Sequence, residues 1–344
     1  MGLHRASMSF SYQGWTSPPT NGRGSGRRRG AFPRGPAESV DMTTVAVAAP
    51  PRRHRPLTVL TWASLALAVI AGIGLIADAR ILTGVPIWLK PFKFAVSFAL
   101  YAWTLAWLIS VLPRRSRVAE GAATIIGAAS VIELAVITVQ VIRGTTSHYN
   151  QSTPLNSALW SAMGMSIMVL FVAHLTIGVV ALRQRVADRA TAYAIRLGLL
   201  ISLIGMLAAF PMTTRKTASG LVGAHSVGVP DGGPGLPLTG WSTVGGDLRI
   251  GHFVGLHALQ VLPLLAYALG RWAGDRFDAT TRARLVLVAG TGYGVLGPLL
   301  TWQAMRAEPL LRPSAVTLAA FLVVAVATAA GLTAVASSSG RMRA

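Results

Sequence analysis

The stretch that decides the fold is a helix written twice, LKPFKFAVSFALY at 89–101 and LRIGHFVGLHALQ at 248–260. The leucine, phenylalanine, alanine and leucine of the first copy return at the same spacing 159 residues later. The basic pair Lys90 and Lys93 returns as Arg249 and His252. Basic side chains are costly at the edge of a bilayer core, so their return predicts a duplicated membrane architecture with polar groups held at one depth.

A second repeated pair of polar residues follows each copy of this helix. Gln140 and Arg143, after the first copy, return as Gln303 and Arg306, 163 residues later. Apolar helices resemble one another by chance, but matched polar residues favour duplication. An even number of spans per repeat gives both halves the same orientation, related by an axis along the membrane normal.

The composition predicts a membrane protein. The 344 residues are 52% hydrophobic and 12% charged, which is too apolar for a soluble protein of this length. There is no cysteine, so disulfides, thiolate metal sites and iron–sulfur clusters are excluded. We expect an all-α integral membrane domain at 56–337, with duplicated halves at about 57–182 and 193–337. Its eight spans, each long enough to cross the hydrocarbon core, are predicted near 57–77, 86–112, 118–142, 158–182, 193–212, 249–270, 283–305 and 314–337.

Basic residues are distributed unevenly over the loops. The formal net charge is +20, and 22 of the 31 Lys and Arg residues lie at the termini or in loops near 113–117, 183–196 and 271–284. The positive-inside rule assigns this side to the cytoplasm, so both termini are expected there. The predominance of Arg and Ala suggests a GC-rich bacterial source. The predicted location is the bacterial cytoplasmic (inner) membrane.

The N-terminal segment 1–55 is rich in Gly, Pro, Ser and Arg and predicts a disordered basic cytoplasmic tail. It lacks the apolar region of a signal peptide. Met42 is an alternative start that would leave 1–41 unexpressed. The Arg-Gly run at 22–30 also suits RNA, but a solvated tail is favoured and no nucleic-acid partner is predicted. At the other terminus, 338–344 is expected to form a short cytoplasmic tail.

Unusual polar residues gather in the extracytoplasmic half of the predicted spans. Single cations near an interface commonly extend to lipid phosphates. Six basic positions paired by a repeat instead favour a site for a small amphipathic or anionic ligand. The residues expected to hold its head group, or the carboxylates of a cofactor, are Lys90, Lys93, Arg143, Arg249, His252 and Arg306. Further ligand-binding candidates are Gln140, His148, Gln260 and Gln303.

Glu133 and His257 are the candidate catalytic pair. Glu133 lies deep within a span at a depth similar to that of His257, and a lone buried carboxylate is costly. It should be protonated or paired, and the expected partner is His257 or a lysine. The alternative is a carboxylic acid that hydrogen-bonds a neighbouring helix. Because Phe98 and Tyr101 of the first copy become His257 and Gln260, the centre of the site is expected on the second copy.

The histidines give weak metal-binding signals. His252 and His257 are five residues apart, which puts their rings about 140° apart around a helix. Metal-binding helices use a spacing of i to i+3 or i+4 instead. His257 or His174 alone is a candidate haem ligand. For His174 a hydrogen bond between helices is the slightly preferred interpretation.

Two extracytoplasmic loops carry specific sequences. The loop RGTTSHYNQSTP at 143–154 places His148 above the helix that carries Glu133. The stretch 213–247 is long, Gly-rich and non-periodic, and loops of this length commonly cover a site or are disordered. We expect it to form a lid over the outer mouth of the site.

The strings RGTTSHYN at 143–150, DGGPGLPLTGW at 231–241 and GDLRIGHFVGLHALQ at 246–260 resemble a family of uncharacterised bacterial multi-pass membrane proteins. The resemblance covers about 57–337 and implies a membrane fold without implying an activity. In architecture alone, eight spans in two halves with histidines in the outer half are similar to haem A synthase. That family has histidines on all four even helices and a Glu-x-x-His-Arg element, which this sequence lacks. Haem is therefore an option that the resemblance does not imply.

Three classes of function remain. The leading one is binding of an amphipathic anionic ligand or cofactor, such as haem or a quinone-like redox partner, with proton or electron transfer at Glu133 and His257. The second is a proton-coupled transporter of a small anion that uses its two halves for alternating access. The third is a membrane-embedded hydrolase. Membrane lipid is the other expected partner, and the sequence leaves the oligomeric state open.

Overall fold

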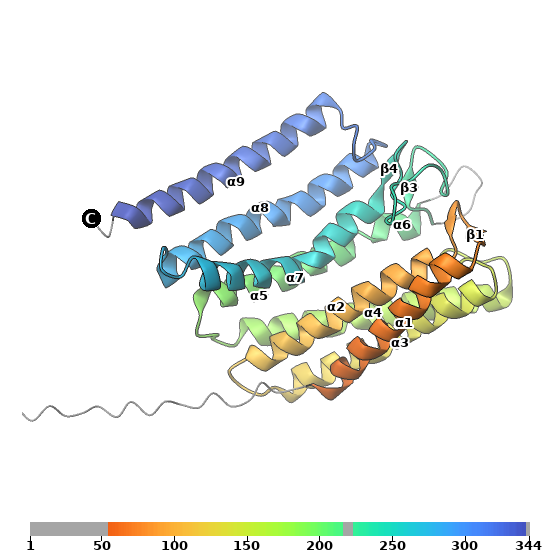
Figure 1. Ribbon diagram of the computed structural model, residues 1–344, viewed down its shortest axis with the longest axis horizontal. Coiled ribbons are helices and arrows are strands. Elements are labelled where there is room, and N and C mark those ends of the chain that lie inside the picture. Colours follow the sequence, from red (N-terminus) through yellow and green to blue (C-terminus); the bar gives the residue numbers. More distant parts are fainter. Residues whose placement is uncertain (1–53, 216–222, 342–344) are drawn as a thin grey trace, which may run out of the picture. The chain divides into compact units, whose positions relative to one another are not determined.

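The computed structural model describes residues 54–215 and 223–341. Most of the predicted N-terminal tail, with Met42, and the last three residues lie outside these ranges. The long helices, shown in Figure 1, are α1 (Arg55–Ala77), α2 (Leu89–Val111), α3 (Arg117–Ile142), α4 (Pro154–Leu182), α5 (Arg189–Leu207), α7 (Leu248–Trp272), α8 (Ala279–Met305) and α9 (Ala315–Arg341).

Eight segments of the described chain are long and apolar enough to cross a membrane. The predicted class, an all-α multi-pass membrane protein, is therefore confirmed for these residues. The fifth segment is α5 followed by the short helix α6 (Phe210–Thr214). Pro211 lies in the first turn of α6. Proline has no amide hydrogen and is accommodated at a helix start, so the break falls just before it.

Several predicted helix boundaries differ by a few residues from the observed ones, and two of them follow capping residues that the sequence interpretation did not use. α4 begins at Pro154 instead of 158, since the Thr153 hydroxyl accepts a hydrogen bond from the amide of Asn156 (3.2 Å). α8 begins at 279 instead of 283, where Asp278 accepts from the amide of Thr281 (2.7 Å). α9 continues to Arg341 through most of the predicted tail at 338–344.

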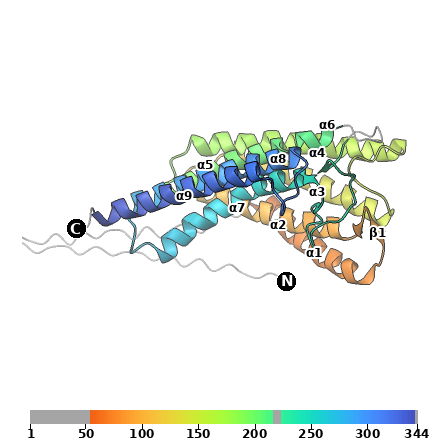
Figure 2. The same cartoon turned by 90° about the horizontal axis from the view of Figure 1, so that it is seen from above.

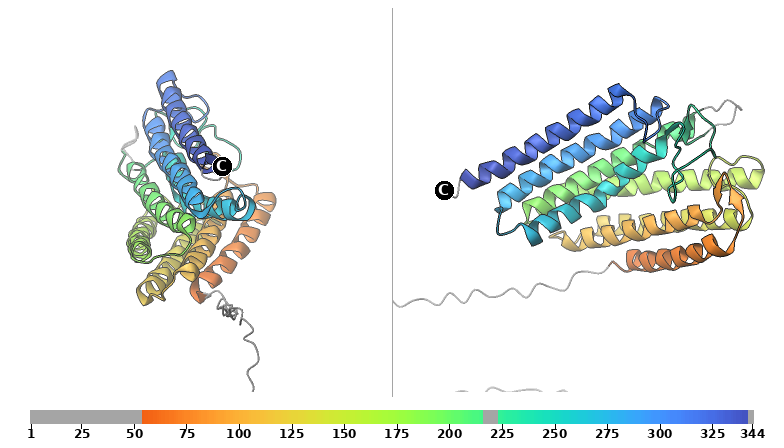
Figure 3. Two further views of the ribbon diagram at one scale, coloured as in Figure 1. Left: turned by 90° about the vertical axis from the view of Figure 1, so that its left-hand side faces the viewer. Right: turned by 45° about the horizontal axis from the view of Figure 1, so that its top comes forward.

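The long helices pack as two groups, α1–α4 and α5–α9, visible end-on in Figure 3. In the first group α1 packs on α2, α2 and α1 on α3, and α3 on α4. In the second, α5 packs on α7, α7 and α5 on α8, and α8 on α9, which is the same order of partners. The groups meet where α4 contacts α5 and α2 contacts α7. A core cluster crosses this junction, with Leu259 of α7 among buried residues of the first group.

Two small antiparallel sheets lie at one end of the bundle, which we call the sheet end. β1 (Ile81–Leu82) pairs with β2 (Val85–Pro86), and β3 (Ser226–Val227) pairs with β4 (Gly246–Asp247). Figure 2 shows β1 and α6 at this same end. Each sheet precedes a copy of the repeated helix, α2 or α7. The start of α1 and the end of α9 lie at the opposite end (Figure 1).

Candidate functional site

The two lysines of α2 lie at the sheet end in different environments. The Lys93 ammonium donates to the carbonyl of Thr239 (2.6 Å) in the loop before β4. Lys90 is half-buried, and its ammonium lies 5.9 Å from the centre of the Phe94 ring. Lys90 makes no hydrogen bond or ion pair with any residue that the structure describes.

Arg249, the second residue of α7, has several hydrogen-bond acceptors around its guanidinium. Its guanidinium binds both carboxylate oxygens of Asp247 (2.9 and 2.6 Å) and donates to the carbonyl of Gly240 (2.6 Å). Asp247 is the N-cap of α7, 1% exposed, and also accepts from the amide of Ser242 (2.8 Å). The sequence interpretation did not include Asp247, although an acid directly before a predicted helix is a capping signal.

The two histidines of α7 have different partners. The His252 ring lies 2.7 Å, through Nδ1, from the carbonyl of Gly205 in α5. A carbonyl only accepts, so Nδ1 carries the hydrogen and Nε2 keeps its lone pair. His257 lies 3.4 Å from the amide oxygen of Gln260, one turn along the same helix. His257 and Gln260 therefore share a face, as their spacing predicts.

Glu133 is almost fully buried and accepts a hydrogen bond from the Ser166 hydroxyl of α4 (2.8 Å). Within the described residues it forms no ion pair, so the expected pairing with His257 or a lysine is not among its contacts. The helix-to-helix hydrogen bond considered as the alternative is present.

Gln140 and Arg143 form a hydrogen-bonded cluster where α3 ends. The buried Gln140 amide donates to the Thr146 carbonyl (3.1 Å) and to the Asn156 side chain (3.0 Å). Arg143 donates to the Gln140 side-chain oxygen (2.5 Å) and to Asn156 (3.0 Å). These contacts hold the 143–153 loop against α4, which is a structural explanation for both residues.

The end of α8 repeats this geometry with one change. The Gln303 amide donates to the Pro309 carbonyl, six residues on, as Gln140 does to Thr146. Arg306 caps α8 as Arg143 caps α3, but its guanidinium binds Glu308 (2.7 Å). The side-chain oxygen of Gln303 is buried without a partner among the described residues.

The residue after the C-cap has the same backbone conformation at the ends of α3 and α8. Gly144 follows the cap of α3 with φ 72°, and Ala307 follows the cap of α8 with φ 59°. Both helices thus end in the left-handed conformation that satisfies their last carbonyl groups. Glycine adopts this conformation without strain and alanine does so only where its surroundings hold it there.

His148 lies in an aromatic cluster with Phe94, Tyr149 and Trp160, at ring-centre distances of 5.7, 6.1 and 5.5 Å. Its Nδ1 lies 3.1 Å from the Ser147 hydroxyl. Burial, then the nearby positive charge of Lys90, hold the pKa of His148 well below its usual range. The ring is neutral at pH 7 and lies close enough to Lys90 to sense its charge.

The predicted lid is ordered by polar contacts where the structure describes it. Asp231 accepts from the amides of His225 and Ser226 (3.0 and 2.8 Å), and its carboxylate lies 3.1 Å from the His225 ring. Burial acts to raise the pKa of Asp231, but the hydrogen bonds from His225 and Ser226 lower it below the usual range. Burial lowers the pKa of His225 despite this acidic neighbour.

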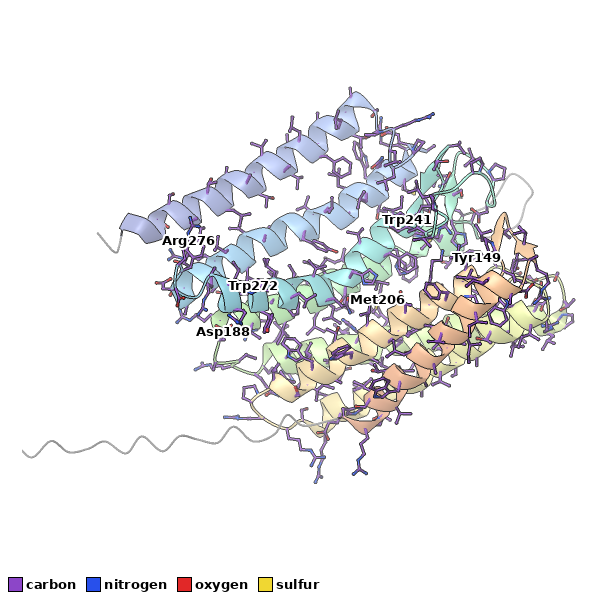
Figure 4. The ribbon with its side chains drawn as sticks, in the orientation of Figure 1. Tyr149, Asp188, Met206, Trp241, Trp272 and Arg276 are labelled. Carbon is purple, nitrogen blue, oxygen red and sulfur yellow. The ribbon has the colours of Figure 1, made fainter. Side chains whose placement is uncertain are left out.

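The lid touches both groups of helices. At the tip of the β1–β2 hairpin Gly84 has φ 76°, and a Cβ there would collide with the carbonyl oxygen of Gly232. Gly84 is thus required both by the turn and by the approach of the lid. Figure 4 shows Tyr149 and Trp241 at this end of the bundle, opposite Trp272 and Arg276.

His174 lies elsewhere, at the contact between the two groups. Its ring is fully buried, with Nδ1 2.7 Å from the Tyr101 hydroxyl of α2 and Nε2 2.9 Å from the Ser202 hydroxyl of α5. The Ser202 hydroxyl also lies 3.0 Å from the Leu199 carbonyl. Tyr101 therefore donates to His174, His174 to Ser202 and Ser202 to Leu199. Neither ring nitrogen is left for a metal in this arrangement.

The structure brings one part of the predicted site together at the sheet end. Glu133 and His174 have their hydrogen bonds elsewhere in the bundle. Lys90, Lys93, Arg249 and His148 lie at the sheet end, where Lys93 and Arg249 contact the lid and the charge of Lys90 acts on His148. Residues not predicted as site residues, namely Tyr149, His225, Asp231 and Asp247, complete this region. Among the residues described, no group of three or more His, Asp or Glu side chains is arranged to hold a metal ion.

Comparison of the chain with protein-family models, with curated proteins and with solved structures gave no match in any of the three. The functional argument therefore comes from the geometry of the chain itself.

Proposed function

We propose that the protein binds an anionic, amphipathic ligand at the sheet end, between α2 and α7 and beneath the lid. The observation that carries this proposal is Lys90, a half-buried cation without a hydrogen-bonding partner among the described residues. A desolvated charge that lacks a partner is costly, so an anion beside Lys90 would relieve that cost.

The local balance of charge supports an anion. Arg249 is matched by Asp247. Burial lowers the pKa of His225, so the Asp231 carboxylate beside it keeps its negative charge and offsets one of the two lysine charges of α2. Lys93 binds only a neutral carbonyl group among its described neighbours. One positive charge of α2 therefore remains for an anionic head group. Phosphate and carboxylate head groups both fit this chemistry.

The matching corners of α3 and α8 support the proposed duplication of four plus four spans. The same order of helix packing in both groups also supports it. We further place the protein in a bacterial inner membrane with both termini cytoplasmic. The concentration of Arg at the terminal end supports this orientation. The site would then face outward.

Haem is one ligand of this class, and the residues present fit it through His252. A histidine that ligates a metal usually donates its other ring nitrogen to a carbonyl or carboxylate group, as His252 does to Gly205. Lys90 and Lys93 would face the propionates. When bound, haem would supply electron transfer. Glu133, held by Ser166, would then act as a proton-holding group at greater depth.

A binding experiment tests the proposal. Wild type, Lys90→Met and Lys93→Met are purified in mild detergent, and native mass spectrometry records any retained small molecule. Each protein is then titrated with haem, followed by its Soret absorption. Binding of haem or of a retained anion should weaken at least about tenfold in Lys90→Met, since a charge-assisted contact is worth roughly 1.5 to 3 kcal/mol.

The matched control is Arg312→Gln, which removes an exposed cation from the same end of the bundle. It should bind as the wild type does. Equal binding by Lys90→Met and wild type in both assays would overturn the proposal. A colourless wild type that retains another anion would keep the site and exclude haem.

A transporter is the second candidate, favoured by the contact between the two groups of helices. The hydrogen bonds of His174 join α2 and α4 to α5 across that contact. Alternating access would require these bonds to break and re-form. Proteoliposomes should then show pH-driven uptake of the bound anion that Glu133→Gln abolishes, and unchanged uptake in that variant would exclude a proton role for Glu133.

A further inference from the structure

An apolar groove lies between α5, α7 and α8, and its lining includes neither lysine of α2. The groove there has a volume of about 390 Å³, within the range of roughly 300–1,000 Å³ found for small-molecule sites. Residues of the second half of α5 form one wall, glycines of α7 and α8 form the base, and the last turns of α8 form the other wall. The main lining residues are Ile201, Ile204, Leu207, Ala208, Gly251, Gly255, Gly297, Trp302 and Met305.

The groove exists because glycines bring the three helices together at its base. A Cβ at Gly205 would lie 2.7 Å from the backbone of Gly255, and a Cβ at Gly251 would collide with Thr301. Small residues allow this close approach of transmembrane helices. They also leave no side chains to fill the space above them, so a groove remains between α5 and α8.

The lining suits a hydrocarbon chain. Its side chains are almost all apolar, and the Thr301 hydroxyl is satisfied by the Gly297 carbonyl (3.0 Å). Leu207 and Met305, on the rim, are 48% and 47% exposed. In a bilayer that exposure faces lipid, so a lipid chain can enter from the side.

Two arginines mark the mouth of the groove at the sheet end. The Arg215 guanidinium lies 3.9 Å from the Met305 sulfur, and the Arg306 guanidinium lies 5.0 Å from the centre of the Trp302 ring. Arg306 also binds Glu308 (2.7 Å), which offsets one of the two charges. Arg215 forms no ion pair with the described residues, so the mouth carries a net positive charge.

We infer that this groove holds one acyl chain of an anionic glycerophospholipid, with the lipid phosphate at Arg215 and Arg306. The apolar lining accommodates the chain, and guanidinium groups bind phosphate through paired hydrogen bonds. The groove is not lined by Lys90 or Lys93, and the inference of a lipid site does not depend on the ligand proposed there. The same groove would bind a zwitterionic phospholipid more weakly, because its choline group meets the same arginines.

The test uses the purified full chain in mixed micelles with equal amounts of phosphatidylglycerol and phosphatidylcholine that carry the same acyl chains. Native mass spectrometry counts the lipids that remain bound. Wild type should retain phosphatidylglycerol with a preference of about tenfold. Arg215→Gln and Arg306→Gln should each reduce that preference at least about threefold. The control Arg312→Gln should leave the preference unchanged.

A second pair of variants tests the groove itself. Ala208→Phe and Ile204→Trp place a large ring within it, and each should remove both lipids without lowering the thermal midpoint. Having two positions guards against one variant failing to fold. Equal retention of both lipids by wild type, or full retention of phosphatidylglycerol by both arginine variants, would overturn the inference.

Discussion

In the repeated helices α2 and α7, the corresponding basic residues have different hydrogen-bond partners. On α7 Arg249 is tied to Asp247 and Gly240, and His252 to Gly205. On α2 Lys93 has one carbonyl partner, and Lys90 has none among the described residues. On the proposed function, α2, the copy with fewer partners among the described residues, would contact the head group of the ligand. The sequence interpretation placed the centre of the site on α7, and that placement stays a prediction.

The difference continues about two turns further along each helix. Tyr101 of α2 occupies the position that corresponds to Gln260 of α7. Tyr101 contacts His174 at 2.7 Å, whereas Gln260 reaches only His257 of its own helix at 3.4 Å. Thus α2 is bound to other helices in its middle and is less constrained at the sheet end. By contrast, α7 has its main polar contacts at the sheet end and only a long contact within its own helix in the middle.

The largest expected effect breaks the fixed end of α7. Arg249→Met leaves the buried Asp247 carboxylate without its main counter-charge, which should cost about 3 kcal/mol of unfolding free energy. Thermal unfolding in detergent measures the change. Arg115→Gln removes a solvent-exposed ion pair with Glu120 and should leave the midpoint unchanged. A variant Arg249→Met as stable as wild type would show that α7 is not held in this way.

The second effect tests the middle of α2. Tyr101→Phe leaves the buried His174 Nδ1 without its donor, at a cost of about 1–3 kcal/mol. Gln260→Leu, the matched change on α7, removes only a long contact and should lower the midpoint much less. Equal losses from both variants would remove the proposed contrast between the helices.

A third prediction concerns pH and the environment of Lys90. The folded pKa of His148 is lowered, so the unfolded chain takes up this proton first as pH falls below about 6.5. Stability is therefore lost as pH falls, by at most about 1.4 kcal/mol per pH unit. The thermal midpoint of wild type should fall between pH 7.5 and 5.5, and that of His148→Phe should fall less. His225, whose pKa is also lowered, would keep part of the slope in the variant.

The smallest effect is expected at Lys90 itself. In ligand-free protein Lys90→Met should leave stability unchanged or raise it by up to about 1 kcal/mol, because an uncompensated cation is replaced by an apolar chain. Lys93→Met loses a hydrogen bond to Thr239 and should be slightly destabilised. A loss at Lys90 as large as that at Arg249 would mean that Lys90 already has a protein partner.

Hydropathy was sufficient to predict the eight spans, because each is a continuous apolar segment. Thr153 and Asp278 set the starts of α4 and α8, and both could have been recognised from the sequence as capping residues. The site was harder to predict. His225 and Asp231 become partners through a turn that sequence spacing does not specify.

Long-range contacts explain the remaining differences. The bonds from Tyr101 to His174 and from His174 to Ser202 join three helices, so periodicity within any one helix gave no sign of them. Glu133 was correctly expected to be buried, but its partner Ser166 is a common residue in transmembrane helices and carries no distinctive signal. A single sequence identifies costly polar groups more readily than the groups that satisfy them.

The contact between Gly84 and Gly232 has a consequence for biogenesis. The two glycines are 148 residues apart in the chain, with α2, α3, α4 and α5 between them. During synthesis the β1–β2 hairpin emerges long before the loop that it will touch. The sheet end therefore stays uncovered by this loop until the fifth span has been synthesised, so the contact between the two glycines forms late in the assembly of the protein.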